Sequence, residues 1–374
     1  MIDKIIQLTY FINRKEKKMT TLIPRPQYTE RIAPFIGKNI IKVLTGQRRI
    51  GKSFILRQVM EEIRRKEPEA HIISINKELE QFRDIRTHED LSHYLEPLLS
   101  KPGPHYLFID EVQEIEGFQF CLRSLLAEEK CDIFCTGSNA QMLSGELATH
   151  LAGRSVSFDV HSLSYREFLT FHRLEAGQES LRKYLTFGGM PYLAHIGLEA
   201  DVPFEYLRSV YSTILLKDTV AREKIRNVHF LEDLVAYLAD NIGNLFSANN
   251  ISKFLKSQRV DLSPQVTLNY LRALSNAYLI HRVSRAEVGG MKIFETGEKF
   301  YFEDIGISHA IRGFNFRRDV HKVMENAVYL HLIQQGYSVH VGQLKEQEID
   351  FVADKSGDKL YVQVSLSVAD EKTA

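Results

Sequence analysis

Short apolar runs and stretches with helical spacing alternate along the first part of the chain. Apolar runs of strand length lie at residues 40–45, 70–75, 105–109, 132–136 and 155–160. Helical stretches at residues 53–60 and 118–127 lie between some of them. Strands that alternate with helices are typical of a parallel sheet with crossover helices. The pattern therefore predicts an α/β domain over residues 28–160, preceded by an N-terminal extension at residues 1–27.

The pattern changes after this domain. Residues 161–225 have helical spacing, with a break at Gly188-Gly189. Within residues 226–300, helices predicted over 251–258 and 264–276 precede a hairpin of residues 279–285 and 292–295. Two helices followed by a hairpin predict a winged-helix-like domain. Residues 301–374 have a helix over 323–334 and strands at 337–342, 348–353 and 359–366, which predicts a further α/β unit.

The first strand leads into a glycine-rich loop that fits the pattern G-x-x-x-x-G-K-[ST]. Its two glycines let backbone N–H groups curl around phosphate oxygens, and the following helix N-terminus favours anions. Lys52 can reach the β- and γ-phosphates of a nucleotide, and Ser53 offers a hydroxyl to Mg²⁺. The predicted nucleotide-binding residues are Gly46, Gln47, Arg48, Arg49, Ile50, Gly51, Lys52 and Ser53.

Two carboxylates end the apolar strand at residues 105–109. Asp110 is predicted to hold Mg²⁺, directly or through water, and Glu111 to polarise the attacking water, as in the Walker B arrangement. The strand at residues 132–136 ends in a polar turn, where Ser138 and Asn139 are equal candidates for contact with the γ-phosphate or for positioning water. An ordinary strand-end turn is the alternative for each of them.

Three arginines have open interpretations. Arg154 precedes the strand at residues 155–160. It either stabilises charge on the γ-phosphate, in cis or from a neighbouring subunit, or is a solvated surface residue. Arg48 and Arg49 face the nucleotide or a partner, and exposure to solvent is the default expectation for both.

Five sequence segments resemble a family of prokaryotic AAA+-type P-loop ATPases. They occur in the family order: GQRRIGKS, LFIDEVQ, TGSN, AGR followed by SLSYREF, and FGGMP. The resemblance extends from Tyr28 to the C-terminus. It implies Walker A and Walker B motifs, a helical lid over residues 161–225 and a poorly characterised C-terminal region.

The last segment resembles a restriction-endonuclease-like core, but it departs from the pattern at the third strand. Glu325 and Asp350 match acidic positions that bind Mg²⁺ in such cores. Gln363 stands where an acid is expected, and Ser365 stands where a lysine is expected. We therefore expect residues 301–374 to be a truncated nuclease-like domain without nuclease activity.

Composition narrows the list of partners. The 374 residues carry 48 basic and 48 acidic side chains, so the formal net charge is zero and a globally basic nucleic-acid binder is disfavoured. A local basic face remains an alternative, so DNA or a protein is the open choice of partner for the winged-helix segment. Its candidate phosphate contacts are Lys253, Lys256, Arg259, Arg272, Arg282 and Arg285.

Cysteine usage and hydropathy predict where the protein works. The three cysteines form no CxxC pair, and no apolar run approaches the roughly 18–20 residues of a membrane span. We expect a cytoplasmic protein with no membrane association and no signal peptide, and Met19 is an alternative start.

The motifs favour an ATPase that uses ATP and Mg²⁺ to drive conformational change in C-terminal DNA- or protein-binding domains. The alternative is a nucleotide-switched regulator with little hydrolysis. A homo-oligomer is an open alternative, and Arg154 would act on a neighbouring subunit in one version of it.

Overall fold

A five-stranded parallel sheet organises the N-terminal half of the protein. The computed structural model describes residues 22–140, 153–199, 201–247, 251, 253, 263–287, 293–344 and 347–365. All five predicted strands are present, and the order across the sheet is β2-β3-β4-β1-β5. Their bounds are β1 (Ile41–Thr45), β2 (His71–Asn76), β3 (His105–Asp110), β4 (Asp132–Gly137) and β5 (Ser155–Asp159).

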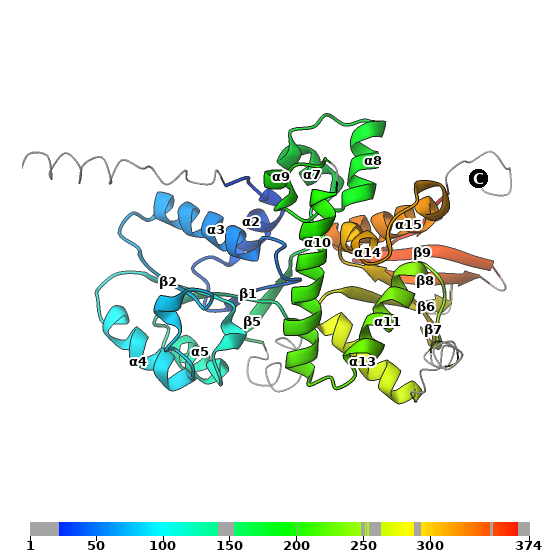
Figure 1. Ribbon diagram of the computed structural model, residues 1–374. Coiled ribbons are helices and arrows are strands. Elements are labelled where there is room, and N and C mark those ends of the chain that lie inside the picture. Colours follow the sequence, from blue (N-terminus) through cyan, green and yellow to red (C-terminus); the bar gives the residue numbers. More distant parts are fainter. Residues whose placement is uncertain are drawn as a thin grey trace, which may run out of the picture.

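Helices cover both faces of this sheet, which makes it a three-layer α/β unit (Figure 1). Alternate residues of each strand point to opposite faces, because the side-chain period of a strand is two. Val43, Leu107 and Ile109 belong to a core with α4 (His88–Leu99) and α5 (Phe118–Ala127). Leu44 and Phe108 belong to another with α2 (Pro26–Ile32) and α3 (Lys52–Lys66). Short 3₁₀ turns lie at η1 (Ala33–Phe35), η2 (Glu80–Phe82) and η3 (Val112–Glu114).

The helical segment predicted after β5 is confirmed. It comprises α7 (Tyr165–His172), α8 (Gln178–Phe187), α9 (Leu193–Ile196) and α10 (Val202–Thr213), and α10 continues as a π-helix, η5 (Ile214–Ala221). In Figure 1, α10 runs down the middle of the molecule between its two halves. The break at Gly189 is a close approach, because a Cβ there would lie 2.4 Å from the carbonyl oxygen of Leu163. The Gly189 N–H also donates to the Asp304 carboxylate at 2.7 Å.

A second five-stranded sheet, in the order β10-β9-β8-β6-β7, organises the C-terminal half. The predicted hairpin is confirmed as β6 and β7, which pair antiparallel, and β6 also pairs parallel with β8. The hairpin is thus continuous with the strands of the C-terminal segment. Its strands are β6 (Ile280–Glu287), β7 (Ile293–Phe302), β8 (Ser338–Leu344), β9 (Gln347–Lys355) and β10 (Asp358–Val362).

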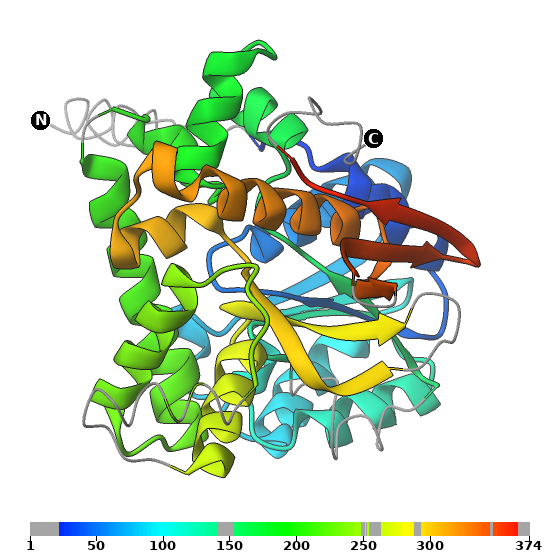
Figure 2. The same cartoon turned by 90° about the vertical axis from the view of Figure 1, so that its right-hand side faces the viewer.

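Four helices accompany this second sheet in the described part of the chain. They are α11 (Val228–Asp240), α13 (Pro264–Asn276), α14 (Ile305–Arg312) and α15 (Phe316–Gln334). Figure 2 shows α15 lying across the sheet, and it contacts β7, β8 and β9. The helix predicted over residues 251–258 lies almost entirely outside the described residues.

One hydrophobic core joins the two halves. It includes Leu44 and Phe108 of the first sheet, Leu207 of α10, and Phe300 and Phe351 of the second sheet. The two sheets therefore pack as parts of one continuous structure, which places the glycine-rich loop next to the C-terminal elements. None of the helices in the described ranges has the length and apolar character needed to cross a lipid bilayer.

Candidate functional site

The glycine-rich loop joins β1 to α3, as the sequence predicts. Gly46 has a φ of 141°, and a Cβ on it would lie 2.2 Å from the carbonyl oxygen of Val160. Gly51 has a φ of 96° and immediately precedes α3. Both backbone conformations are readily reached only by glycine. The loop therefore turns directly into the N-terminus of α3, the end of a helix that favours anions such as phosphate.

Lys52 is the buried cation of this loop. Its side chain is 4% exposed, and its ammonium group donates to the carbonyl oxygens of Gly46 at 2.8 Å and Gln47 at 2.9 Å. Burial lowers the pKa of Lys52, and the charges of Glu111 and Asp110 partly offset that effect. The buried ammonium can pair with an anionic ligand such as a phosphate. The two acids can pair with a metal ion that accompanies this ligand.

Asp110 and Glu111 lie at the C-terminal end of β3, where the sequence predicts them. The Thr136 hydroxyl of the neighbouring strand β4 donates to Asp110 Oδ1 at 2.5 Å and accepts the Glu111 N–H at 2.9 Å. Both carboxylates are 7% exposed. Thr136 thus fixes the position of both acids, and sequence reasoning missed it because a single threonine in a strand has no distinguishing pattern.

Glu111 has an unusual backbone and a crowded side chain. Its φ is +56°, a conformation uncommon for a residue with a Cβ and often found at functional sites. Its carboxylate accepts hydrogen bonds from the Ser138 hydroxyl at 3.0 Å and from the Gln113 amide. Burial raises the pKa of Glu111, but Lys52 and Arg48 outweigh burial, so the pKa lies below its usual range. The surrounding cations and donors therefore favour the charged carboxylate.

Ser138 and Asn139 are both buried at the end of β4. Of the two, Ser138 makes the hydrogen bond to Glu111. That contact places Ser138 beside the predicted water-polarising group. Gln113, which also contacts Glu111, is a site residue that sequence reasoning did not single out, although it lies within the LFIDEVQ segment.

Arg48 corrects one expectation, because it is buried and not exposed. Its guanidinium donates twice to the Asp218 carboxylate, at 2.8 and 3.0 Å, and once to Glu78 at 3.1 Å. Burial lowers the pKa of Arg48, but Asp218 raises it above its usual value. Arg49 is exposed, as expected, with a φ of 71°. A sequence gives no local sign of the Arg48–Asp218 pair, because Asp218 lies on η5, far along the chain.

Two further contacts connect the loop with distant elements. The Gln47 amide donates to the carbonyl oxygen of Tyr278 at 3.0 Å, which links the loop with the start of the second sheet. The carbonyl oxygen of Ile50 accepts from Arg25 at 2.9 Å. Arg25 also makes a two-point ion pair with Glu167 of α7. Sequence reasoning missed Arg25, which lies in the segment assigned to the N-terminal extension.

Arg154 lies at the edge of the sheet opposite the loop. It is exposed, it precedes β5, and its carbonyl oxygen accepts from the N–H of Ile41 at the start of β1. The loop follows the other end of β1, about 15 Å away along a five-residue strand. Arg154 therefore does not reach phosphates bound to its own chain, which corrects the cis interpretation. The neighbouring-subunit and solvent-exposed alternatives remain.

A cavity of about 250 Å³ adjoins the loop. Its lining includes loop residues, Asn76 at the end of β2, and the aromatic residues Tyr192 and Tyr206. The Tyr206 hydroxyl is buried without a hydrogen-bond partner among the described residues, and burial raises its pKa to about 12. Such an orphaned donor fits a cavity that takes a polar ligand. Lys52, Ser53, Arg49 and Glu111 also line it.

The acidic positions of the C-terminal segment converge on a lysine. The Lys299 ammonium lies 2.8 Å from Glu325, 2.8 Å from Glu348 and 3.7 Å from Asp350. The Tyr301 hydroxyl donates to Glu325 at 2.6 Å, and the Gln363 amide oxygen accepts the N–H of Asp350 at 3.4 Å. Sequence reasoning paired Glu325 with Asp350 but missed Lys299, which comes from the preceding hairpin.

The candidate DNA contacts differ in their surroundings: some are exposed, one is paired and two lie outside the described residues. Arg282 makes a two-point ion pair with Glu298 on the neighbouring strand. Lys253 and Arg272 are exposed. Lys256 and Arg259 lie outside the described residues. Contact with DNA stays a prediction.

Comparison with known proteins places this geometry in a family. Residues 38–169 match the model of an AAA domain, and residues 178–318 match a domain of unknown function (DUF8612). An uncharacterized protein of Haemophilus influenzae is 33% identical over 93% of this chain and 88% of its own length. The chain belongs to the family of that protein. The segment that holds the loop, Asp110, Glu111 and Ser138 is the part of the chain that matches the AAA domain model.

Two other relatives extend the comparison. The uncharacterized protein MJ1544 of Methanocaldococcus jannaschii is 29% identical over 84% of this chain and 72% of its own length. A Walker-type ATPase of Pyrococcus abyssi, PABY2304, superposes with a TM-score of 0.51 at 15% identity, over 77% of this chain and 95% of that one. The latter likeness shows a shared fold. The domain match at residues 178–318 extends from α8 into α15, so it includes α10, η5 and the β6–β7 hairpin.

Proposed function

We propose that this protein binds Mg·ATP at the loop of residues 46–53 and hydrolyses it. One observation carries the proposal: the buried Lys52 ammonium shares a cavity with Glu111, at a loop built to receive phosphate. A loop of this type without acids nearby would support binding alone. The ionised Glu111 supplies the acceptor for a proton that hydrolysis requires.

Each group has a role in this proposal. The loop N–H groups and Lys52 bind the β- and γ-phosphates. Ser53 and Asp110 would hold Mg²⁺, which neutralises charge on the phosphates when it is bound. Glu111 orients the attacking water and takes its proton. Ser138 and Gln113 hold the Glu111 carboxylate in place, and Asn139 stays an alternative contact for the γ-phosphate.

The same loop is tied to the C-terminal half, which supports coupling of ATP turnover to conformational change. Gln47 contacts Tyr278, and Arg48 contacts Asp218 on η5. A movement of the loop on binding ATP would therefore change the distances in both contacts. η5 is a π-helix, a rare geometry that is frequent at functional sites. We propose that these two contacts transmit the state of the nucleotide to the C-terminal elements.

A nucleotide-switched regulator with little hydrolysis is the alternative. It keeps every binding role above and leaves Glu111 without a catalytic one. Both versions allow DNA or a protein as the partner of the C-terminal half. Both also allow a homo-oligomer in which Arg154 faces the nucleotide of a neighbour. The rate of phosphate release separates the two versions.

Calorimetry with Mg·ATP tests the binding step. Lys52→Ala should lower the affinity roughly 10- to 100-fold, because it removes a charged hydrogen-bond donor from the phosphates. Lys66→Ala is the control, since Lys66 ends the same helix and pairs with Glu62 on the surface. Equal affinities in a folded Lys52→Ala variant and the parent would contradict the proposal.

A further inference from the structure

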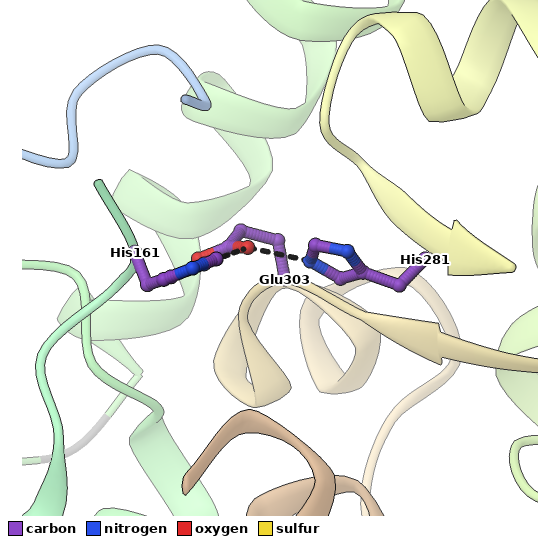
Figure 3. Close-up of side chains that lie close together, drawn as sticks. All are labelled: His161, His281 and Glu303. Atoms are coloured by element: carbon purple, nitrogen blue, oxygen red, sulfur yellow. Dashed lines mark hydrogen bonds and ion pairs between the residues drawn. The ribbon is translucent and has the colours of Figure 1, made fainter. Parts of the chain in front are cut away.

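Two imidazoles and one carboxylate meet where the two halves of the protein join. His161 follows β5 of the first sheet, His281 lies in β6, and Glu303 follows β7 of the second sheet. One ligating atom from each lies within 4.8 Å of the others. Figure 3 shows the Glu303 carboxylate between the two rings, which both point toward it.

The distances within this cluster are short. Glu303 Oε2 lies 3.1 Å from His161 Nδ1 and 2.6 Å from His281 Nε2. The carboxylate side chain is 1% exposed, and the two imidazoles are 10% and 17% exposed. The cluster is thus nearly closed to solvent, with both rings on the same carboxylate oxygen.

Surrounding groups hold the Glu303 carboxylate, the His281 ring and the backbone of His161. The Ser162 N–H donates to Glu303 Oε1 at 2.7 Å, and the Ser162 hydroxyl donates to the Glu303 carbonyl oxygen at 2.7 Å. The carbonyl oxygen of His161 accepts from Arg25 at 3.0 Å, and the His281 ring packs against Tyr329. Ligands held by a second layer of hydrogen bonds and packing are typical of metal sites.

We propose that His161, His281 and Glu303 bind a divalent transition-metal ion of the Zn²⁺ class. Two imidazole nitrogens and one carboxylate oxygen are a donor set that Zn²⁺ prefers over Mg²⁺ or Ca²⁺, which take oxygen ligands. Three protein ligands leave a fourth tetrahedral position for water. This site is separate from the Mg·ATP site proposed at residues 46–53 and uses none of its residues.

The three ligand atoms must shift relative to one another to accept the ion. Bonds of about 2.0–2.2 Å in a tetrahedral site put neighbouring ligand atoms about 3.3 Å apart. The separation of Glu303 from His161, 3.1 Å, must therefore widen by about 0.2 Å, and its separation from His281, 2.6 Å, by about 0.7 Å. Without metal, imidazole N–H groups hold the carboxylate. On binding, each ligating nitrogen must be free of its proton. A neutral imidazole carries its one proton on the other ring nitrogen, and a protonated imidazole releases one proton to solvent.

The proposed ion would cross-link the two halves of the protein. Its ligands come from the end of β5, from β6 and from the end of β7, which are distant in sequence and adjacent in the fold. An ion bound only by the folded state raises the stability of that state in proportion to its occupancy. The metal would thus stabilise the junction beside the loop contact between Gln47 and Tyr278.

Titration of the metal-stripped full-length protein tests the proposal. Calorimetry with Zn²⁺ should give one saturable site, and Co²⁺ should give the visible absorption of a tetrahedral ion. His281→Ala should weaken the site at least about 100-fold, because it removes one of three ligands. His71→Ala is the matched control, since it removes a histidine from another close pair, stacked on His105. It should leave the site unchanged.

A second variant covers the risk that His281→Ala does not fold. Glu303→Gln keeps the shape of the side chain but removes its charge, so it should weaken Zn²⁺ binding while circular dichroism shows an intact fold. Absence of a saturable site in the parent would overturn the proposal. Binding that is unchanged in the folded Glu303→Gln protein would overturn it as well, since the ion would then lie elsewhere.

Discussion

Arg48 of the phosphate-binding loop and Asp218 of the π-helix η5 form a two-point ion pair across 170 residues of sequence. The guanidinium is 6% exposed and the carboxylate 1% exposed. A bidentate pair of this kind fixes orientation as well as distance. The conformation of the loop and that of η5 are therefore linked, which is the physical basis for the proposed coupling.

Breaking this pair should destabilise the fold. Asp218→Asn leaves Arg48 buried without its two-point partner, and the charges of Glu78 and Glu111 remain near it. Loss of one partner from a buried pair costs about 3–5 kcal/mol, and we expect about 3 kcal/mol in the free energy of unfolding. Urea denaturation of the parent and the variant measures it. Asp233→Asn, at a more exposed position, should cost less than about 1 kcal/mol. Equal losses in the two variants would refute the prediction.

His309 should make the protein sensitive to mild acid. Burial lowers its pKa from 6.5 to about 4, and its Nε2 has no hydrogen-bond partner among the described residues. Between pH 6.5 and about pH 4, His309 is therefore protonated in the unfolded state but neutral in the folded state. The stability from this group is complete above pH 6.5 and falls by roughly 3 kcal/mol as the pH drops to about 4.

The parent should lose more stability between pH 7 and 4.5 than His309→Gln does, as measured by urea midpoints at each pH. Other buried groups contribute equally to the pH dependence of both proteins, so the comparison isolates His309. One of these groups is His172, whose pKa burial also lowers to about 4. Parallel curves for the two proteins would show that His309 does not titrate in this range.

The C-terminal sheet should not cleave DNA. Lys299 places its ammonium among Glu325, Glu348 and Asp350, where a nuclease would hold Mg²⁺. Gln363 and Ser365 supply neither the third acid nor the cationic group of that chemistry. Supercoiled plasmid incubated with Mg²⁺ should remain intact. Nicking that disappears in Asp350→Ala would identify an active nuclease instead.

The strands and the first-sheet acids were predictable because their signals are local. Apolar runs located every strand of the first sheet, and Asp110 and Glu111 followed from the rule that acids at strand ends meet at one sheet edge. The same rule applies to Arg154. Arg154 precedes β5, whereas the loop follows the parallel strand β1, so the two lie at opposite edges of the sheet. The sequence therefore already argued against the cis interpretation.

The remaining contacts depend on the packing of distant segments. Asp218, Thr136 and Arg25 carry no local pattern, and each acquires its role only when the chain folds. The hairpin and its strands were predicted, but its pairing with β8 was not, because strand order across a sheet leaves no trace in periodicity. The burial of Arg48 was missed for the same reason.

Steady-state release of phosphate at saturating Mg·ATP tests the central claim most directly. The parent should turn over ATP, and Glu111→Gln should retain ATP binding while its rate falls about 10²-fold or more, because the proton acceptor is lost. Glu114→Gln, three residues on and paired with Lys217 and Arg222, should keep the parent rate. A parent without turnover, or a Glu111→Gln variant at the parent rate, would contradict the account.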